Sequence, residues 1–195
     1  VLQRIWKADG MTPEFSQEAL HAFLSEFVSK GLDLAPFLPI YKEFLAAYPT
    51  NFDAHLDLQS LLYMLDKHSE RHAQLVRMTE LFPTGHPELW NGLFQDLLSR
   101  GAYDELYKYF PQALKQYPHE GSLFLFKSLA EETSGDLELA KRTALQGIAQ
   151  ADTTQTEVLS DLYGQVGDLC VAQHKNQDAI AAYEESIKLN EKNAT

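Results

Sequence analysis

Apolar residues recur along the chain at spacings of three and four positions, in stretches separated by short polar or proline-containing breaks. This spacing places apolar side chains on one face of an α-helix, whereas a strand would alternate every second residue. Three such stretches end in an aromatic–proline pair, at Tyr48-Pro49, Phe82-Pro83 and Tyr117-Pro118, and the pairs fall 34 and 35 residues apart. A fixed period of this length predicts an array of repeated helical units.

The third unit carries the pattern most fully. From Trp90 to Pro118 the chain reads Trp-x2-Leu-Phe-x2-Leu-x3-Gly-x-Tyr-x2-Leu-x3-Phe-x2-Ala-Leu-x3-Pro. This resembles the tetratricopeptide repeat, a helix-turn-helix unit of about 34 residues. The last unit has Gly167, Ala179 and Tyr183 at the corresponding offsets, although Glu191 stands where the proline is expected.

The resemblance implies an all-α fold, a right-handed superhelical α-solenoid of antiparallel helix pairs with about ten helices. Counting from the prolines gives one repeat domain over residues 16–195, with five units at about 18–49, 52–83, 87–118, 121–154 and 160–193. The first, second and fourth units are degenerate, with His21 and His55 at a usual aromatic position and Lys127 at an apolar one. Small residues such as Gly167 should let paired helices approach closely, and Trp90 should pack in the core.

Glycine and proline predict where helices turn. Gly31, Gly101 and Gly135 mark turns inside hairpins, and Pro36 and Pro87 fall where first helical turns are expected.

Two further local signals concern single helices. Pro111 lies in the middle of a predicted helix, where it removes the bond to the Tyr107 carbonyl, so we expect a bend there. Thr154-x-x-Glu157 has the spacing of a capping box before a helix that runs through Ala172.

The two ends of the chain suggest a piece of a longer bacterial repeat protein. Residues 1–15 are expected to be an N-terminal segment or the tail of a preceding helix, because Leu2, Ile5 and Trp6 have amphipathic spacing. At the other end, Ile180 and Ile187 do not give the last helix the polar face of a terminal cap.

The charge balance excludes one class of partner. Sixteen Lys and Arg residues against 28 Asp and Glu residues give a net charge of −12, and such a field repels polyanions, so no nucleic acid partner is expected. No apolar run approaches the roughly 18 residues of a membrane-spanning helix. The single cysteine, Cys170, forms no internal disulfide and leaves the compartment open. General similarity to arrays of Gram-negative bacteria favours the periplasm or cell envelope, with the cytoplasm as the alternative.

The sequence contains no catalytic signature that we can identify. It has no phosphate-binding glycine loop, no Gly-x-Ser-x-Gly elbow and no Cys/His nucleophile pattern, so we expect neither enzymatic activity nor a cofactor. His68 and His72 are four residues apart and could share a metal ion on a helix. No third ligand lies nearby, and the pair straddles a predicted hairpin turn, so we expect a solvated pair and no metal site.

The resemblance implies that the inner face of the array, lined by the first helix of each unit, binds a polypeptide. The candidate residues are Asp53, Asp57, Ser60, Met64, Glu88, Asn91, Gln95, Leu98, Asp161, Gln165 and Asp168. Only Asn91 belongs to the basic and amide set with which related proteins clamp a terminal carboxylate, so the acidic face favours a basic or amphipathic segment.

Two alternatives stay open at this point. The acidic residues could serve only to keep the surface solvated. The chain could also be a structural or self-associating spacer, with Trp6, Tyr107 and Tyr109 extending a partner surface.

Overall fold

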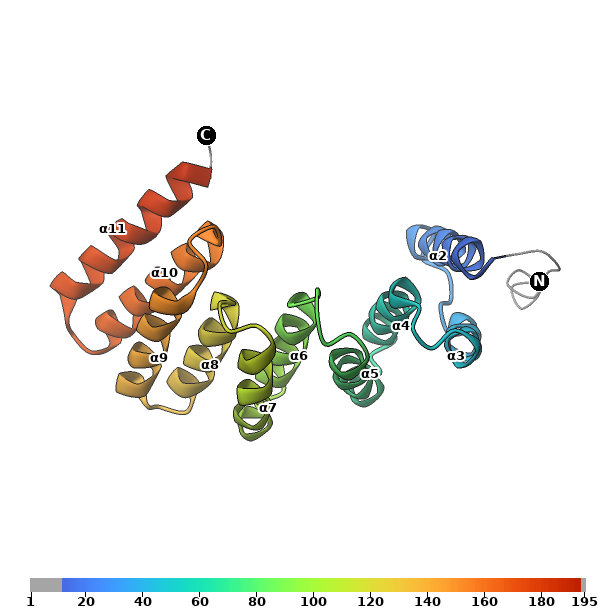
Figure 1. The fold of residues 1–195 in the computed structure, drawn as a ribbon, viewed down its shortest axis with the longest axis horizontal. Helices are drawn as coiled ribbons and strands as arrows, with labels where there is room; N and C mark the ends of the chain where they lie inside the picture. Colours follow the sequence, from blue (N-terminus) through green and yellow to red (C-terminus); the bar gives the residue numbers. More distant parts are fainter. Residues whose placement is uncertain (1–11, 194–195) are drawn as a thin grey trace. The chain divides into compact units, whose positions relative to one another are not determined.

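All elements of the structure, a computed structural model that describes residues 12–193, are α-helices (Figure 1). Leu2, Ile5 and Trp6 lie outside the described residues, so the expected tail of a preceding helix stays a prediction. The chain divides into two compact units, Val1–Leu81 and Phe82–Thr195. The described part of the N-terminal unit contains α2(Pro13–Ser29), α3(Phe37–Ala47), α4(Phe52–Met64) and α5(His68–Leu81). The C-terminal unit contains α6(Glu88–Ser99), α7(Tyr103–Gln116), α8(Gly121–Thr133), α9(Leu137–Gln150), α10(Thr156–Ala172) and α11(Asn176–Asn193).

The first helix of every pair ends in the same turn. Residues 31, 66, 101, 135 and 174 all have a positive φ, and the amide after each donates to a carbonyl five residues earlier. This is the Schellman arrangement, which satisfies carbonyls left open at a helix end. Gly31, Gly101 and Gly135 confirm the predicted turns, but Asp66 and His174 take the same left-handed conformation without being glycine.

Two second helices, α3 and α7, end at aromatic–proline pairs, as the sequence period predicted. Tyr48 and Tyr117 are the C-cap residues of α3 and α7, with nearly equal φ values of −127° and −130°. The residue before a proline is disfavoured in the helical region, so the helix stops there. Pro36 and Pro87 lie one position before their helices, as N-cap residues rather than inside the first turn.

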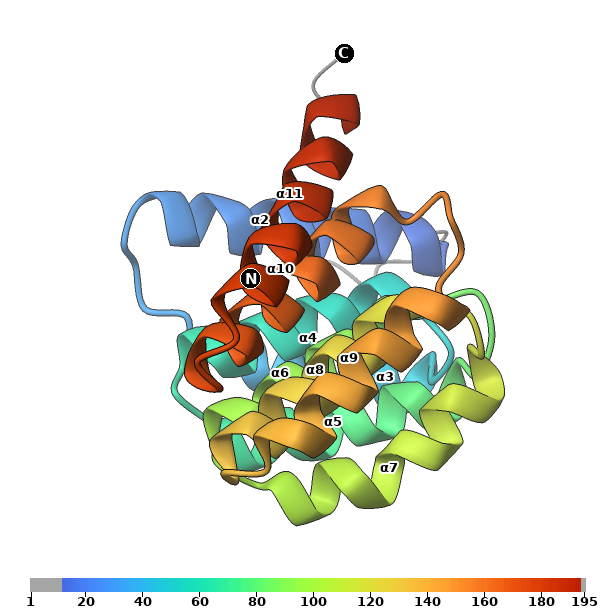
Figure 2. The same ribbon diagram turned by 90° about the vertical axis from the view of Figure 1, so that its left-hand side faces the viewer.

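Close helix packing in the C-terminal unit depends on small residues. Helices α8 to α11 lie side by side in sequence order (Figures 1 and 2). A Cβ added at Gly167 of α10 would lie 2.4 Å from the ring of Tyr183 on α11, and one at Gly147 would lie 2.6 Å from Cβ of Phe124. Trp90 is fully buried, which confirms its predicted core role.

The core of the N-terminal unit joins α2, α3 and α4. Leu20 of α2, Phe37 and Phe44 of α3 and Leu61 of α4 are completely buried in one cluster. Phe27 and Phe37 add an edge-to-face ring contact at 5.1 Å between centroids, which spans the connection from α2 to α3. This shared core places the first helices α2 and α4 next to each other.

Two local predictions need comment. The capping box at Thr154 is wrong, because α10 begins at Thr156, which makes Gln155 the N-cap residue, and no side-chain hydrogen bond caps it. The predicted end of that helix at Ala172 is right. Helix α7 continues from Tyr103 to Gln116 through Pro111 without a break, and the bend there stays a prediction.

Candidate functional site

A groove runs between the first helices of the N-terminal unit. It has a volume of about 500 Å³ and is lined by Gln17, Glu18 and His21 of α2 and by Asp53, Leu56, Asp57 and Ser60 of α4. Three of the predicted binding residues, Asp53, Asp57 and Ser60, therefore lie together. All three side chains of this lining that carry a formal charge at neutral pH are carboxylates, so the groove attracts cations.

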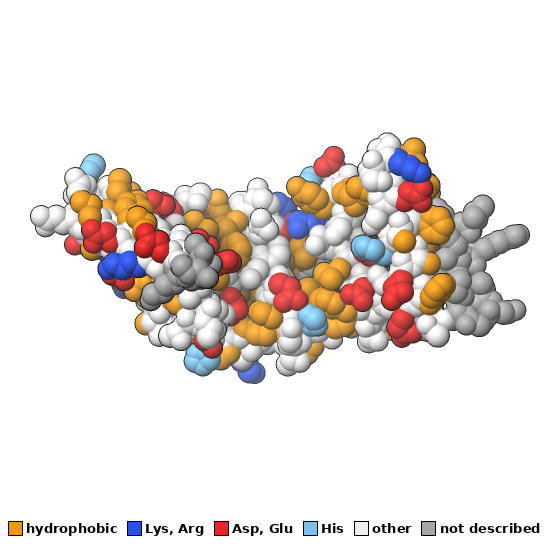
Figure 3. All heavy atoms as spheres, turned by 90° about the horizontal axis from the view of Figure 1, so that it is seen from above, with side chains coloured by type: hydrophobic (Ala, Val, Ile, Leu, Met, Phe, Trp, Pro, Cys, Tyr) orange, Lys and Arg blue, Asp and Glu red, His pale blue; other side chains and the backbone are white. Residues whose placement is uncertain are grey.

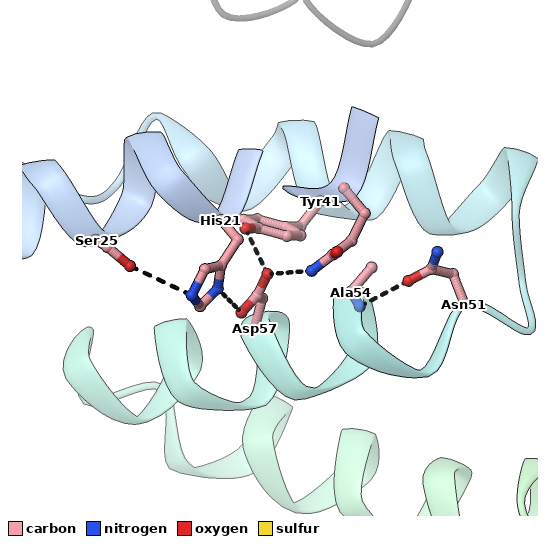
Figure 4. A network of polar contacts seen from close by, with 7 residues as sticks. His21, Ser25, Tyr41, Asn51, Ala54 and Asp57 are labelled. Carbon is pink, nitrogen blue, oxygen red and sulfur yellow. Dashed lines mark hydrogen bonds and ion pairs between the residues drawn. The ribbon is translucent and has the colours of Figure 1, made fainter. Parts of the chain in front are cut away.

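Asp57 is the polar centre of this groove. Its buried carboxylate accepts hydrogen bonds from Gln17 Nε2 at 3.1 Å and from Tyr41 Oη at 2.9 Å, both at Oδ2. Its Oδ1 lies 2.7 Å from His21 Nδ1 (Figure 4). The Asp57 side chain thus ties α4 to α2 and to α3, and it is fixed in place rather than free to follow a partner.

Tyr41 stays a donor in this network. Burial raises the pKa of its phenol far above its ordinary value, and the Asp57 carboxylate raises it further by charge and by hydrogen bonding. Because the carboxylate is an acceptor only, each of its partners must offer a hydrogen. The His21 nitrogen beside this carboxylate, Nδ1, therefore carries a hydrogen, and the other ring nitrogen, Nε2, lies 3.5 Å from Ser25 Oγ.

The remaining acids of the groove are open to solvent. Glu18 and Asp53 are both exposed, one on each side, and half-buried Leu56 adds an apolar surface between polar neighbours. Asp53 also lies in the first turn of α4, where a negative charge is favourable. A ligand entering the groove would meet these two carboxylates first.

The C-terminal unit brings part of its predicted residues into contact with neighbouring first helices. Asn91 Oδ1 of α6 accepts a hydrogen bond from the Ser122 hydroxyl of α8 at 2.6 Å. Gln165 of α10 donates to Glu132 Oε2 of α8 at 2.7 Å, so both amide residues link adjacent first helices. Both hydrogen bonds join first helices of the C-terminal unit, α6 to α8 and α10 to α8.

Asp161 and Asp168 of α10 each lie close to another ionisable side chain. Asp161 is exposed, yet partial desolvation and the nearby Glu157 carboxylate raise its pKa. Asp168 accepts a hydrogen bond from Tyr183 Oη at 2.6 Å, and this bond raises the pKa of Tyr183 to about 12. A cation placed near Asp161 would relieve the repulsion between neighbouring carboxylates.

The other predicted residues lie outside the groove of the N-terminal unit. Met64 is 38% exposed at the end of α4 and does not line it. On α6, Gln95 is exposed and Leu98 half-buried, while Glu88 lies 2.9 Å from His86 Nδ1. Acidic side chains are spread between apolar patches on the face drawn in Figure 3.

Within residues 12–193, no group of three or more His, Cys, Asp or Glu residues is placed so that it could hold a metal ion. His68 and His72 both belong to α5, which begins at His68, so the expectation that they straddle a turn is wrong. Cys170 is fully buried, as predicted. Among the described helices none combines the length and apolar character needed to cross a membrane.

Sequence reasoning missed the contribution of α2 to the groove. Gln17, Glu18 and His21 lie at spacings of three and four residues and share one helix face. That spacing was a usable signal, but the repeat offsets of the degenerate first unit pointed to Ala22, Glu26 and Ser29, which do not line the groove.

Solved structures supply the remaining comparison. No protein-family model matches the chain, and no curated protein matches it. MamA from Desulfovibrio magneticus, from residue 41 to its end, superimposes with a TM-score of 0.64 at 12% identity, covering 92% of this chain and 97% of that one. PilF of Pseudomonas aeruginosa gives a TM-score of 0.64 at 13% identity, with 90% and 77% covered.

A third neighbour names the repeat. YrrB, described as a TPR protein with an unusual peptide-binding site, gives a TM-score of 0.58 at 11% identity, with 97% of this chain and 92% of that chain covered. The chain has the tetratricopeptide repeat fold. At these identities the likeness concerns the fold of the TPR array and leaves function to be argued from its surface.

Proposed function

We propose that this TPR protein is a non-catalytic scaffold that binds a basic or amphipathic polypeptide segment on the acidic surface of its first helices. The observation that carries the proposal is the groove between α2 and α4, whose charged lining consists of carboxylates. The peptide-binding site in the description of the structural neighbour YrrB supports the same use of the fold.

The groove suggests a division of roles. Glu18 and Asp53 are exposed and would pair with Lys or Arg side chains, while Leu56 would contact an apolar residue of the same segment. Asp57 has its donors already and would keep the walls of the groove in register. Ser60 adds a hydroxyl that can accept or donate a hydrogen bond.

The C-terminal unit would offer a second surface of the same character. Its exposed acids on α6 and α10 would contact basic positions of a segment bound to this unit, and the predicted set there is Glu88, Asn91, Gln95, Leu98, Asp161, Gln165 and Asp168. Desolvation and the Glu157 carboxylate raise the pKa of Asp161, so a nearby basic side chain would stabilise its charged form.

A defined peptide tests this function. A fluorescent amphipathic helix of lysine and leucine should bind, and a glutamate–leucine peptide of the same spacing should not. The double variant Glu18→Gln with Asp53→Asn removes two ion pairs, each worth about 0.2–1 kcal/mol at an exposed site, so the Kd should rise roughly two- to thirtyfold. Added salt should weaken binding because exposed charges are screened.

A matched control distinguishes the loss of charge in the groove from the loss of charge elsewhere on the protein. Glu14→Gln with Glu80→Gln removes the same charge from exposed positions outside the groove lining, one of them in a first helical turn like Asp53. This control should keep the wild-type Kd to within about a factor of two at equal ionic strength. Equal loss in both double variants would refute a localised site.

A self-associating spacer is the second candidate function. It is favoured by the outer face of α11, where Ile180 is 59% exposed and Ile187 is 56% exposed. Tyr109 does not support it, because its ring packs 6.3 Å from that of Trp90, and Tyr107 is half-buried. Light scattering over a concentration series distinguishes the two: a constant monomer mass supports the scaffold, and a mass that rises with concentration supports the spacer.

A further inference from the structure

A serine, a histidine and an aspartate lie in line at the edge of the groove. Ser25 Oγ is 3.5 Å from His21 Nε2, and His21 Nδ1 is 2.7 Å from Asp57 Oδ1 (Figure 4). His21 and Ser25 are four residues apart on α2, so they share one face of the helix. The Ser25 separation is long for a hydrogen bond, and such bonds in an unliganded site often tighten when substrate binds.

The network around Asp57 determines the state of the histidine. The carboxylate receives the Gln17 amide and the Tyr41 hydroxyl at Oδ2, so its Oδ1 is left for His21. An acceptor-only carboxylate requires the hydrogen of neutral His21 to be on Nδ1. The lone pair on Nε2 then points to Ser25 and can accept the proton of its hydroxyl.

Both reacting groups are open to a small molecule. The His21 side chain is 59% exposed and lines the groove, and Ser25 is exposed beside it. Ser29, one turn further along the same helix, provides a contrast. It is exposed too, but its hydroxyl donates to the Glu26 carbonyl at 2.8 Å and therefore has its proton engaged by backbone.

We propose that Ser25 is an activated nucleophile that accepts an acyl group from an activated ester or thioester. Ser25 Oγ would attack the carbonyl carbon while His21 Nε2 takes the hydroxyl proton. The tetrahedral intermediate would then expel the alcohol or thiol with the electron pair of the broken bond, and His21 would return the proton to this leaving group. The products are an ester on Ser25 and a free alcohol or thiol.

The surroundings of Ser25 favour a single acylation over turnover. Ser25 lies inside α2, where backbone amides donate to carbonyls four residues earlier and are not available to an oxyanion. Oxyanion donors contribute about 10²–10³-fold to each acyl-transfer step, and both steps lack that assistance here. Hydrolysis of the acyl-serine is the slower of the two, because the serine alkoxide is a poorer leaving group than the alcohol or thiol of an activated ester. The site is thus an acyl acceptor within a binding protein.

Acetylation with p-nitrophenyl acetate tests the proposal on the intact chain. The expected result is a burst of one p-nitrophenolate per chain, with the acetyl group located by tandem mass spectrometry on Ser25. General-base assistance is worth about 10²–10⁴-fold, so Ser25 should be acetylated at least about 100 times faster than Ser29.

Variants assign the effect to the residues named. His21→Gln should slow acetylation of Ser25 to the rate of Ser29, whereas Ser29→Ala should leave the Ser25 rate unchanged. Circular dichroism establishes that each variant is folded, and the comparison of the two serines in the wild-type chain needs no variant. Equal rates at Ser25 and Ser29, acetylation confined to lysines, or an unchanged Ser25 rate in His21→Gln would each overturn the proposal.

Discussion

Gly167 on α10 faces the ring of Tyr183 on α11 so closely that an added Cβ would lie 2.4 Å from the ring. The pair matches a small residue on one helix of the last unit to a bulky residue on the other. The ring fills the space that the missing side chain leaves, and the two helices pack at short range.

Gly167→Ala should therefore destabilise the C-terminal unit. Forcing a methyl group against the Tyr183 ring costs about 1–3 kcal/mol, because the ring or the backbone must move to make room for it. Gly164→Ala on the same helix is the matched control, because its nearest neighbour would be Ser186 Oγ at 3.9 Å. That control should be neutral or stabilising by up to about 1 kcal/mol, as alanine favours helix. Urea unfolding measures both, and an equal effect of the two changes would contradict the packing argument.

Asp57→Ala should loosen the N-terminal unit. The change removes the acceptor for Gln17 and Tyr41, and each buried donor left unpaired costs about 1–3 kcal/mol. Hydrogen exchange should show faster opening of α2, whose attachment to α4 includes these bonds. Glu80→Ala on the exposed face of α5 is the control and should stay within about 0.5 kcal/mol of wild type.

The N-terminal unit should lose stability in mild acid because of His55. Burial and the nearby Arg77 charge outweigh a hydrogen bond to the Pro49 carbonyl, so the pKa of His55 is lowered from 6.5. The unfolded chain then binds a proton that the folded chain resists, and the stability present above pH 6.5 is lost as the pH falls toward the lowered pKa. Urea unfolding measured across this range should depend less on pH in His55→Gln than in the wild-type chain, and an unchanged dependence would contradict the assignment.

His174→Gly should stabilise the turn between α10 and α11. His174 is exposed with a φ of 59°, a conformation that side-chain-bearing residues adopt at a cost of about 1–2 kcal/mol. Glycine adopts a positive φ without most of this cost, so the variant should unfold with a higher thermal midpoint. The opposite exchange at the equivalent turn, Gly135→Ala, should lower the midpoint because its φ is 90°. A lower midpoint for His174→Gly would contradict the assignment.

Local and periodic features of this fold could be predicted from sequence, and contacts between distant residues could not. The aromatic–proline period predicted where α3 and α7 end, because backbone sterics at proline are local. The turn at His174 escaped prediction because the Schellman bond pattern imposes the left-handed conformation on whatever residue occupies the position.

The candidate site shows the same limit. Asp57 was identified by its offset in the repeat, but its partners Gln17 and Tyr41 come from 40 and 16 residues away. Which carboxylate is buried and bonded, and which is open like Asp53, depends on how α2 and α3 pack onto α4. Thr154 failed as a cap because α10 begins at Thr156, one residue later than the capping box requires.

The most direct test of the central claim is a titration of the ¹⁵N-labelled chain with the lysine–leucine peptide, followed by amide chemical shifts. Amides of the groove, those of Glu18, Asp53 and Ser60 among them, should shift first, and these shifts should be smaller in the Glu18→Gln, Asp53→Asn variant at the same peptide concentration. Shifts confined to the second helices α3 and α5, or shifts that the double variant retains in full, would contradict it.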